Sequence, residues 1–337
     1  MKKESPNGQS SKDKGAQKTV TNKTIGPASD LEQHLQPDWW KRIFNSMYLK
    51  TDSDVVDDSQ ITKTEVDLFQ QILNVQDGNT LLDLACGQGR HLLEFNTRGN
   101  FNLFGLDRSR YLIQRAKNLS KKKGIAINFK EGDARKLPYP TDTFDFVTNL
   151  GNSFGYFETL DDDTKILKEI FRVLKPGGIL LMEIADGDYL RKSYQPRSWE
   201  WIDKKHFVCR ERTMASDNQR LISREVITNT EKGVIVDQFY AERLYAKEDL
   251  VELLKDVNFK EVTFHGNISS ESQRNQDLGM MENRFLLTAR SIKEWTPKKI
   301  KKDVKNVVVI MGDPSLKDII KPDAVFDSDD FDTIDKL

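Results

Sequence analysis

The segment Leu81–Arg90, with the sequence LLDLACGQGR, constrains the fold more than any other part of the chain. Its apolar start predicts a buried strand, which runs directly into a Gly-x-Gly turn at Gly87 and Gly89 and then into a helix. Open α/β sheets bind ligands at the carboxyl ends of their strands, where this turn would lie. Because glycines let a ligand approach the main chain closely, the segment predicts a ligand site at the edge of a parallel sheet.

Two positions distinguish this turn from a nicotinamide-dinucleotide site. A third glycine is expected at position 92, where the chain has Leu92. Asp83 places a carboxylate inside the strand, where it would repel a pyrophosphate but would suit a cationic ligand with an amino group. Both differences disfavour an NAD-dependent dehydrogenase.

Acidic residues also end the next two predicted strands. Asp107 lies 20 residues after Gly87, where a carboxylate can accept hydrogen bonds from two ribose hydroxyls. Asp133 follows the third strand and could accept from the exocyclic amine of adenine, while the Ala134 amide faces the ring. Turn capping explains any one of these acids equally well. Three acids at successive strand ends, together with the glycine turn, favour a ligand that contains a nucleoside.

These segments resemble those of class I S-adenosylmethionine-dependent methyltransferases. Asp83–Arg90 is similar to the glycine-rich first motif of that family, Asp107 to its ribose-binding acid, and Asp133 with Ala134 to its adenine contact. Residues 144–147 resemble its fourth strand, and residues 174–178 the turn before its fifth. The resemblance covers about residues 66–184 in order and returns for the last helix and strands.

The resemblance implies S-adenosyl-L-methionine as the cofactor and methyl transfer as the activity (EC 2.1.1.-). It places the Leu150 main chain near the methionine amino group, and the Tyr48 hydroxyl could reach the cofactor, although simple packing explains Tyr48 equally well. The predicted cofactor-binding residues are Tyr48, Asp83, Ala85, Gly87, Gly89, Arg90, Asp107, Arg108, Asp133, Ala134, Asn149 and Leu150.

Strands and helices alternate between residues 80 and 184. Strands are predicted at 80–84, 103–106, 125–129, 144–149 and 179–184, and helices at 90–97, 109–122 and 161–174. A helix at 247–257 and strands at 262–265 and 284–289 complete the pattern. The chain therefore predicts an α/β fold with a doubly wound, mainly parallel seven-stranded sheet, the Rossmann-like methyltransferase fold.

Two helices are expected before this sheet. Trp40, Ile43, Phe44 and Met47 follow helical spacing, and a second helix would begin with Thr62 and Glu65 in a capping-box arrangement.

The alternation breaks after the fifth strand. Segments 206–214, 220–229 and 234–244 are separated by short polar connections typical of hairpins. They predict an antiparallel cap inserted at about residues 187–245. By its layout this cap resembles those of small-molecule N-methyltransferases that act on amino sugars or amino acids, where it can also mediate homodimers.

Methyl transfer depends mainly on aligning the nucleophile with the methyl carbon in a dry pocket. An amine needs little more than a proton acceptor, whereas a hydroxyl would want a general base or a metal. Tyr156 after the fourth strand, Asp186 after the fifth and His206 at the start of the cap are the candidate catalytic residues. A structural hydrogen bond is the competing explanation for His206. No metal-ligand spacing is present.

Substrate contacts are expected from the segment after the fourth strand, at Ser153 and Phe154, and from the cap, at Arg224 and Arg243. Arginines suit a carboxylate or a phosphate, and cross-strand pairing with glutamates is the competing explanation. We predict methyl transfer to a small molecule, at the nitrogen of an amino acid, amino sugar or peptide-like compound. The alternatives are an RNA or protein methyltransferase and a non-catalytic cofactor-binding module.

Composition narrows these alternatives. The 337 residues carry a net charge of -1, which gives no electrostatic argument for nucleic acid. Two cysteines form no disulfide framework, and no segment is apolar enough to cross a membrane, so a cytoplasmic protein is predicted.

Domain boundaries follow from the same composition. Residues 1–29 predict a disordered tail, residues 30–295 the methyltransferase domain, and residues 296–337 a linker with the start of a further domain. Within that last part, residues 307–313 resemble the opening strand of D-alanine–D-alanine ligase-type ATP-grasp proteins. This resemblance would make the chain part of a fusion to an ATP-grasp ligase.

Overall fold

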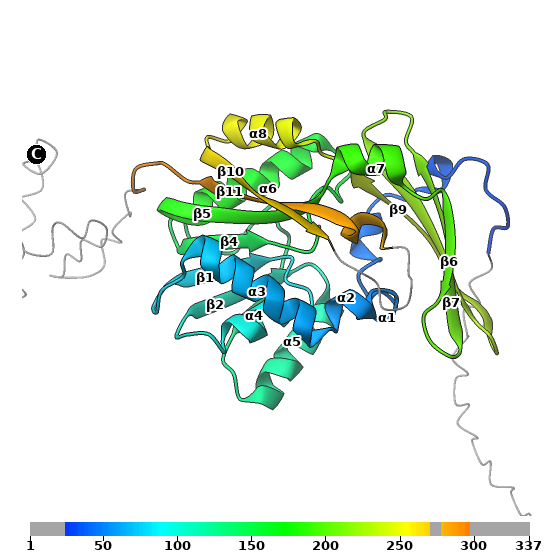
Figure 1. The fold of residues 1–337 in the computed structure, drawn as a ribbon, viewed down its shortest axis with the longest axis horizontal. Helices are drawn as coiled ribbons and strands as arrows, with labels where there is room; N and C mark the ends of the chain where they lie inside the picture. The colour runs from blue at the N-terminus through cyan, green and yellow to red at the C-terminus, as the bar shows by residue number, and fades with distance from the viewer. Residues whose placement is uncertain (1–23, 270–277, 297–337) are drawn as a thin grey trace, which may run out of the picture.

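The computed structural model describes residues 24–269 and 278–296. Its larger sheet has seven strands in the order β10-β11-β5-β4-β1-β2-β3 (Figure 1). Neighbours among β1 to β5 are parallel, and β11 pairs antiparallel with both β5 and β10. The strands are β1 (Thr80–Leu84), β2 (Asn102–Asp107), β3 (Asn128–Glu131), β4 (Phe144–Asn149), β5 (Leu174–Ala185), β10 (Lys260–Ser269) and β11 (Asn283–Arg290). The predicted fold class is confirmed.

Helices cover both faces of this sheet. One apolar core lies beneath α6 (Leu160–Val173) and α8 (Lys247–Asp256). The other lies beneath α3 (Ser59–Leu73), α4 (Arg90–Phe95) and α5 (Arg110–Lys123). Burial of these two apolar layers is the main force that holds the strands in register, and hence their carboxyl ends together.

Local sequence signals fix several of these boundaries. The Ser109 side chain caps α5 by accepting from the Leu112 N–H, and Gly124 ends that helix with a φ of 68°. The capping box expected at Thr62 and Glu65 is wrong. Asp58 caps α3 instead, so the helix begins earlier and Glu65 lies buried in its interior.

The predicted antiparallel cap is a four-stranded sheet. Strands β7 (His206–Met214), β8 (Arg220–Asn229) and β9 (Gly233–Arg243) match the expected segments. The edge strand β6 (Arg197–Trp201) and the short helix α7 (Gly187–Ser193) were not predicted. Figure 1 shows this sheet standing across the carboxyl ends of β1, β4 and β5.

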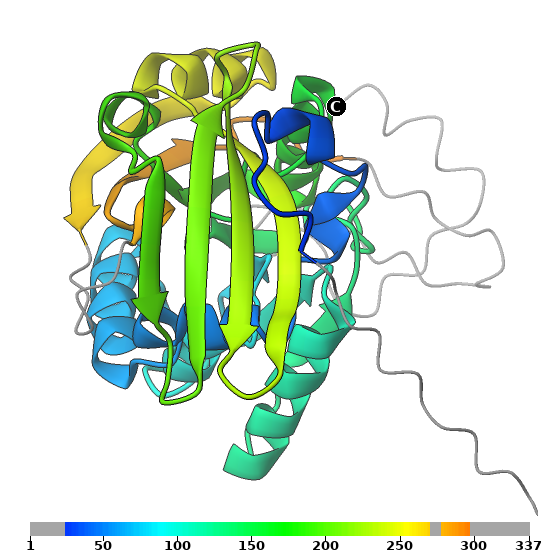
Figure 2. The same cartoon turned by 90° about the vertical axis from the view of Figure 1, so that its right-hand side faces the viewer.

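The segment before α3 differs most from expectation. Instead of one helix near residues 40–47, it forms η1 (Glu32–His34), η2 (Trp39–Lys41), α1 (Tyr48–Thr51) and α2 (Ser53–Val56). A left-handed Asp38 precedes η2, and Trp39 and Trp40 pack with Ile222 and Ala241 of the antiparallel sheet. Figure 2 shows the first part of this segment, with η1 and η2, lying on the outer face of that sheet, whereas α1 and α2 lie on its inner side and line a cavity.

A disordered N-terminal tail and a C-terminal linker with the start of a further domain were predicted for the two ends of the chain. Residues 24–26, expected in a disordered tail, instead bond to the antiparallel sheet: Arg224 donates to the Gly26 carbonyl, and Asp237 accepts from the Ile25 N–H. Residues 1–23 and 297–337, which include the segment resembling an ATP-grasp strand, lie outside the described residues. Within the described ranges, every helix is too short or too polar to cross a membrane.

Candidate functional site

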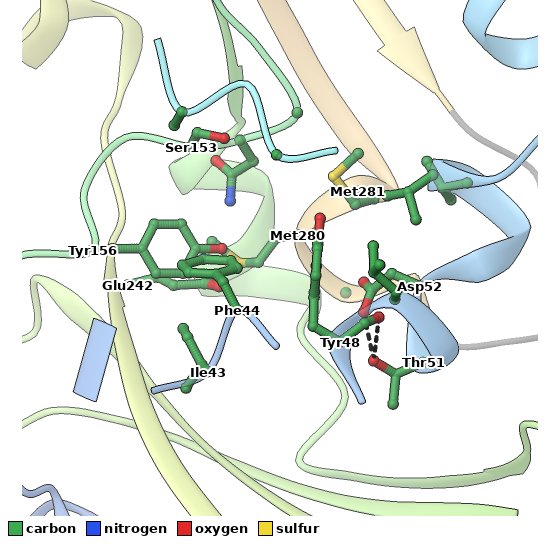
Figure 3. Close-up of a pocket in the computed structure, with 18 of the residues that line it drawn as sticks. Ile43, Phe44, Tyr48, Thr51, Asp52, Ser153, Tyr156, Glu242, Met280 and Met281 are labelled. Atoms are coloured by element: carbon green, nitrogen blue, oxygen red, sulfur yellow. Dashed lines mark hydrogen bonds between the residues drawn. The ribbon is translucent and has the colours of Figure 1, made fainter. Parts of the chain in front are cut away.

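A cavity lies between the carboxyl ends of β1 and β4 and the inner face of the antiparallel sheet (Figure 3). Its floor is the turn after β1 with the start of α4, which contributes Asp83, Ala85, Cys86, Gly87, Gln88, Arg90 and His91, and the loop after β4, which contributes Leu150, Gly151, Asn152, Ser153 and Tyr156. The N-terminal segment between Ile43 and Val56 and, separately, residues 278–281 line it as well. The antiparallel sheet contributes Arg210, Arg212, Ser223, Glu225, Gln238, Tyr240 and Glu242.

The glycine turn brings main chain to the surface of this cavity. Ala85 and Gly87 both have left-handed backbone conformations, with φ of 60° and 55°. A Cβ on Gly87 would meet no atom within 4 Å, so the space above it is open to a ligand. A Cβ on Gly89 would lie 2.7 Å from the Phe129 ring, so that glycine is needed for packing of the turn.

Asp107 holds the same turn from below. Its two carboxylate oxygens accept from the N–H groups of Gly87 at 2.8 Å and Ser109 at 2.7 Å. Burial raises the pKa of Asp107 to about 6, against the lowering effect of these two hydrogen bonds. Asp107 therefore orders the turn, although it does not line the cavity.

Asp83 does line the cavity and is 2% exposed. Its Oδ1 accepts from the Thr148 hydroxyl at 2.9 Å, whereas Oδ2 has no hydrogen-bond partner within the described residues. Burial raises the pKa of this carboxyl. A buried acceptor without a partner is costly, and a cationic amino group in the cavity would satisfy it. The amino group of the methionine part of S-adenosylmethionine fits that requirement.

A layer of paired charges lies beneath the turn. Arg90, one of the predicted cofactor contacts, lines the cavity, but its guanidinium donates to Thr62 and Glu65. Glu65 also contacts His91, and these partners hold its pKa low despite burial. The fully buried Arg284 pairs with Glu183.

Glu183 in turn fixes the loop after β4, because its Oε2 accepts from the Gly151 N–H at 2.8 Å. Leu150 and Ser153 of this loop line the cavity, as predicted for neighbours of the ligand. Asn149 does not: its side-chain amide donates to the Leu84 carbonyl and ties β4 to β1.

The residues predicted to contact adenine do not line this cavity. Both oxygens of Asp133 accept from the Arg135 guanidinium, which lies 5.0 Å from the Trp40 ring centroid. Although partial burial raises the pKa of Asp133, these hydrogen bonds outweigh it and lower the pKa overall. Ala134 packs against the core, and Arg108 is half exposed above Trp40. Asp133 is thus paired with an arginine that lies against the N-terminal segment, and its side chain stays 32% exposed outside the cavity.

The opposite wall is the polar inner face of the antiparallel sheet. Cross-strand register aligns Arg212 with Ser223 and Tyr240, and Arg210 with Glu225 and Gln238. Arg210 donates to Glu225 and to Glu200, so its charge is balanced within the sheet. Arg212 donates to the Gln195 carbonyl at 3.1 Å.

Glu242 lies on the same face, next to Tyr156 (Figure 3). The Tyr156 hydroxyl donates a hydrogen bond to the Glu242 carboxyl, which is 4% exposed. Burial raises the pKa of Glu242 to about 7, although this hydrogen bond and the positive charge of Arg212 lower it. Burial likewise raises the pKa of Tyr156, so its hydroxyl stays protonated.

Aromatic rings from the N-terminal segment close this end of the cavity. The Phe44 ring meets both Tyr48 and Tyr156 edge-on, with centroids 5.3 Å apart in each pair. The Phe44 carbonyl accepts from the Ser109 hydroxyl, which anchors the segment above the glycine turn. Tyr48 therefore lies in the cavity wall, where the sequence placed it.

Two candidate catalytic residues lie elsewhere. His206 bonds to Asp203 through Nδ1 and to Asn229 through Nε2, and it does not line the cavity. Asp186 caps α7 by accepting from the N–H groups of Asp188 and Tyr189. This placement corrects the expectation that either residue faces the transfer site, since each has a structural role away from the cavity.

The predicted substrate contacts divide in the same way. Ser153 lines the cavity, but Phe154 is buried in the sheet core beside Tyr245. Arg224 lies on the outer face of its strand, where it pairs with Asp237 and Glu211. Arg243 is likewise turned away and bonds to Asp163. Apolar neighbours in sequence indicated their burial correctly but not which face they occupy.

Sequence reasoning missed Glu242 and Tyr240. The signal that could have found them is strand alternation: Arg210 and Arg212 lie on the cavity face at even spacing, and the hairpin register carries that face to residues 240 and 242 of β9.

The fold and this site together define an α/β protein with a cavity above the turn that follows the first strand of the parallel sheet. A family model described as a methyltransferase domain matches residues 81–178. The chain is 33% identical over 212 residues to a demethylmenaquinone methyltransferase of Oceanobacillus iheyensis, which covers 54% of this chain and 84% of that enzyme. The chain therefore belongs to the S-adenosylmethionine-dependent methyltransferase family.

Other relatives match over a shorter length. A sterol 24-C-methyltransferase of Pneumocystis carinii is 35% identical over 107 residues, and the chain spans 27% of that enzyme. Among solved structures, an S-adenosylmethionine-dependent methyltransferase from Clostridium acetobutylicum has a TM-score of 0.57 at 20% identity. The match covers 72% of this chain and 96% of that one and shows a shared fold.

Proposed function

We propose that this protein transfers a methyl group from S-adenosylmethionine to the nitrogen of a small amino compound. One observation carries the proposal: a single cavity is lined at one end by Asp83 and the glycine turn and at the other by the polar face of the antiparallel sheet. When bound, the cofactor supplies an electrophilic methyl group. The protein's part is to bind and orient both molecules and to exclude water.

The residues present suit the cofactor at the turn. Asp83 would accept from its amino group, Gly87 and Leu150 would offer main chain, and Tyr48 would close over it. Asp107 would keep the turn in place and could accept from the ribose. The assignment of Asp133 and Ala134 to adenine, and of Arg108 to the cofactor, remains a prediction.

A small amino compound is favoured by the walls of the cavity. Four carboxylic side chains line it, from Asp52, Asp83, Glu225 and Glu242. Arg90, Arg210 and Arg212 line the cavity as well, but Arg90 and Arg210 are paired with glutamates. Asp83 and Glu242 each keep a buried oxygen without a hydrogen-bond partner in the described residues, which favours a cationic ligand over an anionic one. The names of the relatives cover different substrates, including demethylmenaquinone and sterols, so family membership alone leaves the substrate open. The homodimer through the cap and the cytoplasmic location likewise remain predictions.

Calorimetry with S-adenosylhomocysteine tests the cofactor half of the proposal on the full chain. The parent protein should bind, and Asp83→Asn should weaken binding by about 10- to 100-fold, because a charge-assisted hydrogen bond to the amino group is lost. Asp186→Asn is the matched control, since asparagine caps a helix as well as aspartate does. Absence of binding to the parent protein would refute the assignment of the cofactor.

The nitrogen assignment needs a separate measurement. Turnover of methyl-labelled cofactor should be compared between amines and the alcohols of the same shape, drawn from amino acids and amino sugars. Transfer to amines is expected, and transfer to the alcohols alone would contradict it.

A further inference from the structure

We infer that Glu242 accepts the proton that the substrate amine must lose before methyl transfer, and that the Tyr156 hydroxyl positions this carboxyl. The inference rests on the proposed function and names the group in the cavity that would make the amine nucleophilic.

The position of Glu242 on its strand is the first argument. In the register of β8 and β9 its cross-strand neighbour is Leu221, which in turn lies opposite Met214. The sheet therefore offers its carboxyl no cationic partner in the same row. Oε2 of Glu242 is buried and has no hydrogen-bond partner within the described part of the chain, although the residue lines the cavity.

The other carboxyls that line the cavity are engaged differently. Glu225 accepts from Arg210 and from Gln238. Asp52 accepts from the Thr51 hydroxyl at 2.6 Å. Asp83 lies in the first strand of the parallel sheet, at the turn assigned to the cofactor. Among these four carboxyls, only Glu242 both belongs to the antiparallel sheet, the wall opposite the glycine turn, and keeps an acceptor oxygen without a hydrogen-bond partner in the described residues.

Charged and titratable groups face Glu242 from each element around it. Arg212 approaches from β7, Glu225 from β8, Tyr156 from the loop after β4, and Asp52 from the segment between α1 and α2. Tyr240, two residues earlier on β9, also interacts with it. The two acids reinforce the effect of burial, while Arg212 and Tyr156 oppose it, and the resulting pKa of about 7 suits a group that takes up and releases a proton near neutrality.

This acidity matches an amine better than an alcohol. An α-amino group has a pKa of about 8, close to that of Glu242, whereas a hydroxyl resembles water and loses its proton only near about 16. In the proposed step an N–H bond of the substrate ammonium breaks and an O–H bond forms on Glu242. The nitrogen keeps the electron pair and is then free to accept the methyl group.

Tyr156 acts through Glu242 and is therefore a positioning residue. Its hydroxyl remains protonated and donates to the carboxyl, which restricts the rotation of that group, while Oε2 has no hydrogen-bond partner in the described residues. Removing this donor leaves the proton acceptor in place but raises its pKa, because the hydrogen bond favours the ionised form.

Three variants test the inference in the full chain: Glu242→Gln, Tyr156→Phe and, as a matched control, Glu231→Gln, which removes an exposed carboxyl at the tip of the β8–β9 hairpin that pairs with Lys205. All three should bind S-adenosylhomocysteine as the parent does, so a failure here is distinct from a failure of the proposed function. Glu242→Gln should lower the turnover of the preferred amine by about 100-fold or more, and the control should leave it unchanged.

The pH profile gives a readout that a structural role would not move. Because the ionised form of Glu242 accepts the proton, turnover by the parent should be lost as pH falls through about 7. Tyr156→Phe should shift this limb to higher pH, and Glu242→Gln should leave only the limb that the substrate amine itself produces at a pH of about 8. Carbon-13 NMR of glutamate-labelled protein should show one carboxyl that titrates near neutrality and is missing from Glu242→Gln. The inference would be overturned if the Glu242 carboxyl titrated in the ordinary glutamate range, or if Glu242→Gln kept the pH profile of the parent. The NMR measurement needs no substrate, so it tests the inference even if no amine is found that the protein methylates.

Discussion

The two walls of the cavity place their buried charges in opposite ways. On the parallel-sheet side, the pairs Arg284–Glu183 and Arg90–Glu65 lie beneath the surface, and they support main chain that faces the cavity. On the antiparallel side, Arg212 and Glu242 face the cavity directly. The first wall therefore presents main chain to the cavity together with the side chains of Asp83 and Arg90, whereas the second presents only side chains of its strands.

This difference bears on how each wall can change. A backbone site depends on its supporting pairs, so substitutions there affect folding first. A side-chain site can be altered on a fixed strand with little effect on the fold, provided that no buried charge loses its partner. The comparison predicts that stability and specificity are controlled by different residues.

Arg284→Met should have the largest effect. The side chain is fully buried, and its removal leaves the Glu183 carboxylate buried without a counterion. The free energy of unfolding should fall by about 3–5 kcal/mol, measured by urea denaturation. Adding Glu183→Gln to this variant should recover part of the loss. A cost below about 1 kcal/mol for the single variant would show that the parallel-sheet wall does not depend on this pair.

Gly155→Ala should have an intermediate effect, because Gly155 joins the two walls. Its carbonyl accepts from the Arg243 N–H, its φ is 92°, and an added Cβ would lie 2.9 Å from the Arg243 carbonyl oxygen. We expect a loss of about 3 kcal/mol in the free energy of unfolding. Gly151→Ala is the matched comparison: its φ is 63° but the space around it is open, so about 1 kcal/mol is expected. Equal losses would mean that the junction between the walls is not tightly packed.

His206→Ala should have the smallest effect. Within the described residues the His206 ring bonds only to Asp203 and Asn229, and it lies outside the cavity. Turnover should stay within about twofold of the parent, and the free energy of unfolding should fall by about 1 kcal/mol. A loss of activity as large as that of Glu242→Gln would place the chemistry on this residue and would contradict the division between the walls.

The same comparison explains how far the sequence could predict the molecule. The strand that carries Asp83, the turn at Gly87 and the helix capped by Ser109 depend on residues close together in the chain, so local patterns located them. The cavity wall formed by the antiparallel sheet depends instead on the register between its strands. Cross-strand pairing with an arginine is the expected role for a glutamate in such a sheet, but the register sets Glu242 opposite Leu221, and its side chain lines the cavity.

Tertiary packing overrode local patterns at two further places. Trp40, Ile43 and Phe44 have helical spacing, but Trp40 packs on the antiparallel sheet while Phe44 lines the cavity, so no single helix face serves them all. Strand β6 escaped prediction because its five residues alternate exposed aromatic side chains with polar ones, as at Trp199 and Trp201. Its aromatic side chains face solvent and the buried residue between them is the charged Glu200, the reverse of the pattern expected for a half-buried strand.

The path of the N-terminal segment has a consequence for how such enzymes diversify. Residues 24–40 lie along the outer face of the antiparallel sheet, where the Trp39 indole donates to the Ala241 carbonyl, and the stretch from Ile43 to Val56 then lines the cavity beneath its inner face. Both faces of the antiparallel sheet are thus in contact with a stretch of chain that lies some 150 residues away in sequence. Recombination that exchanged the sheet alone would separate it from the N-terminal segment that packs on it. The sheet and this segment would therefore have to be exchanged together, although two distant parts of the gene encode them.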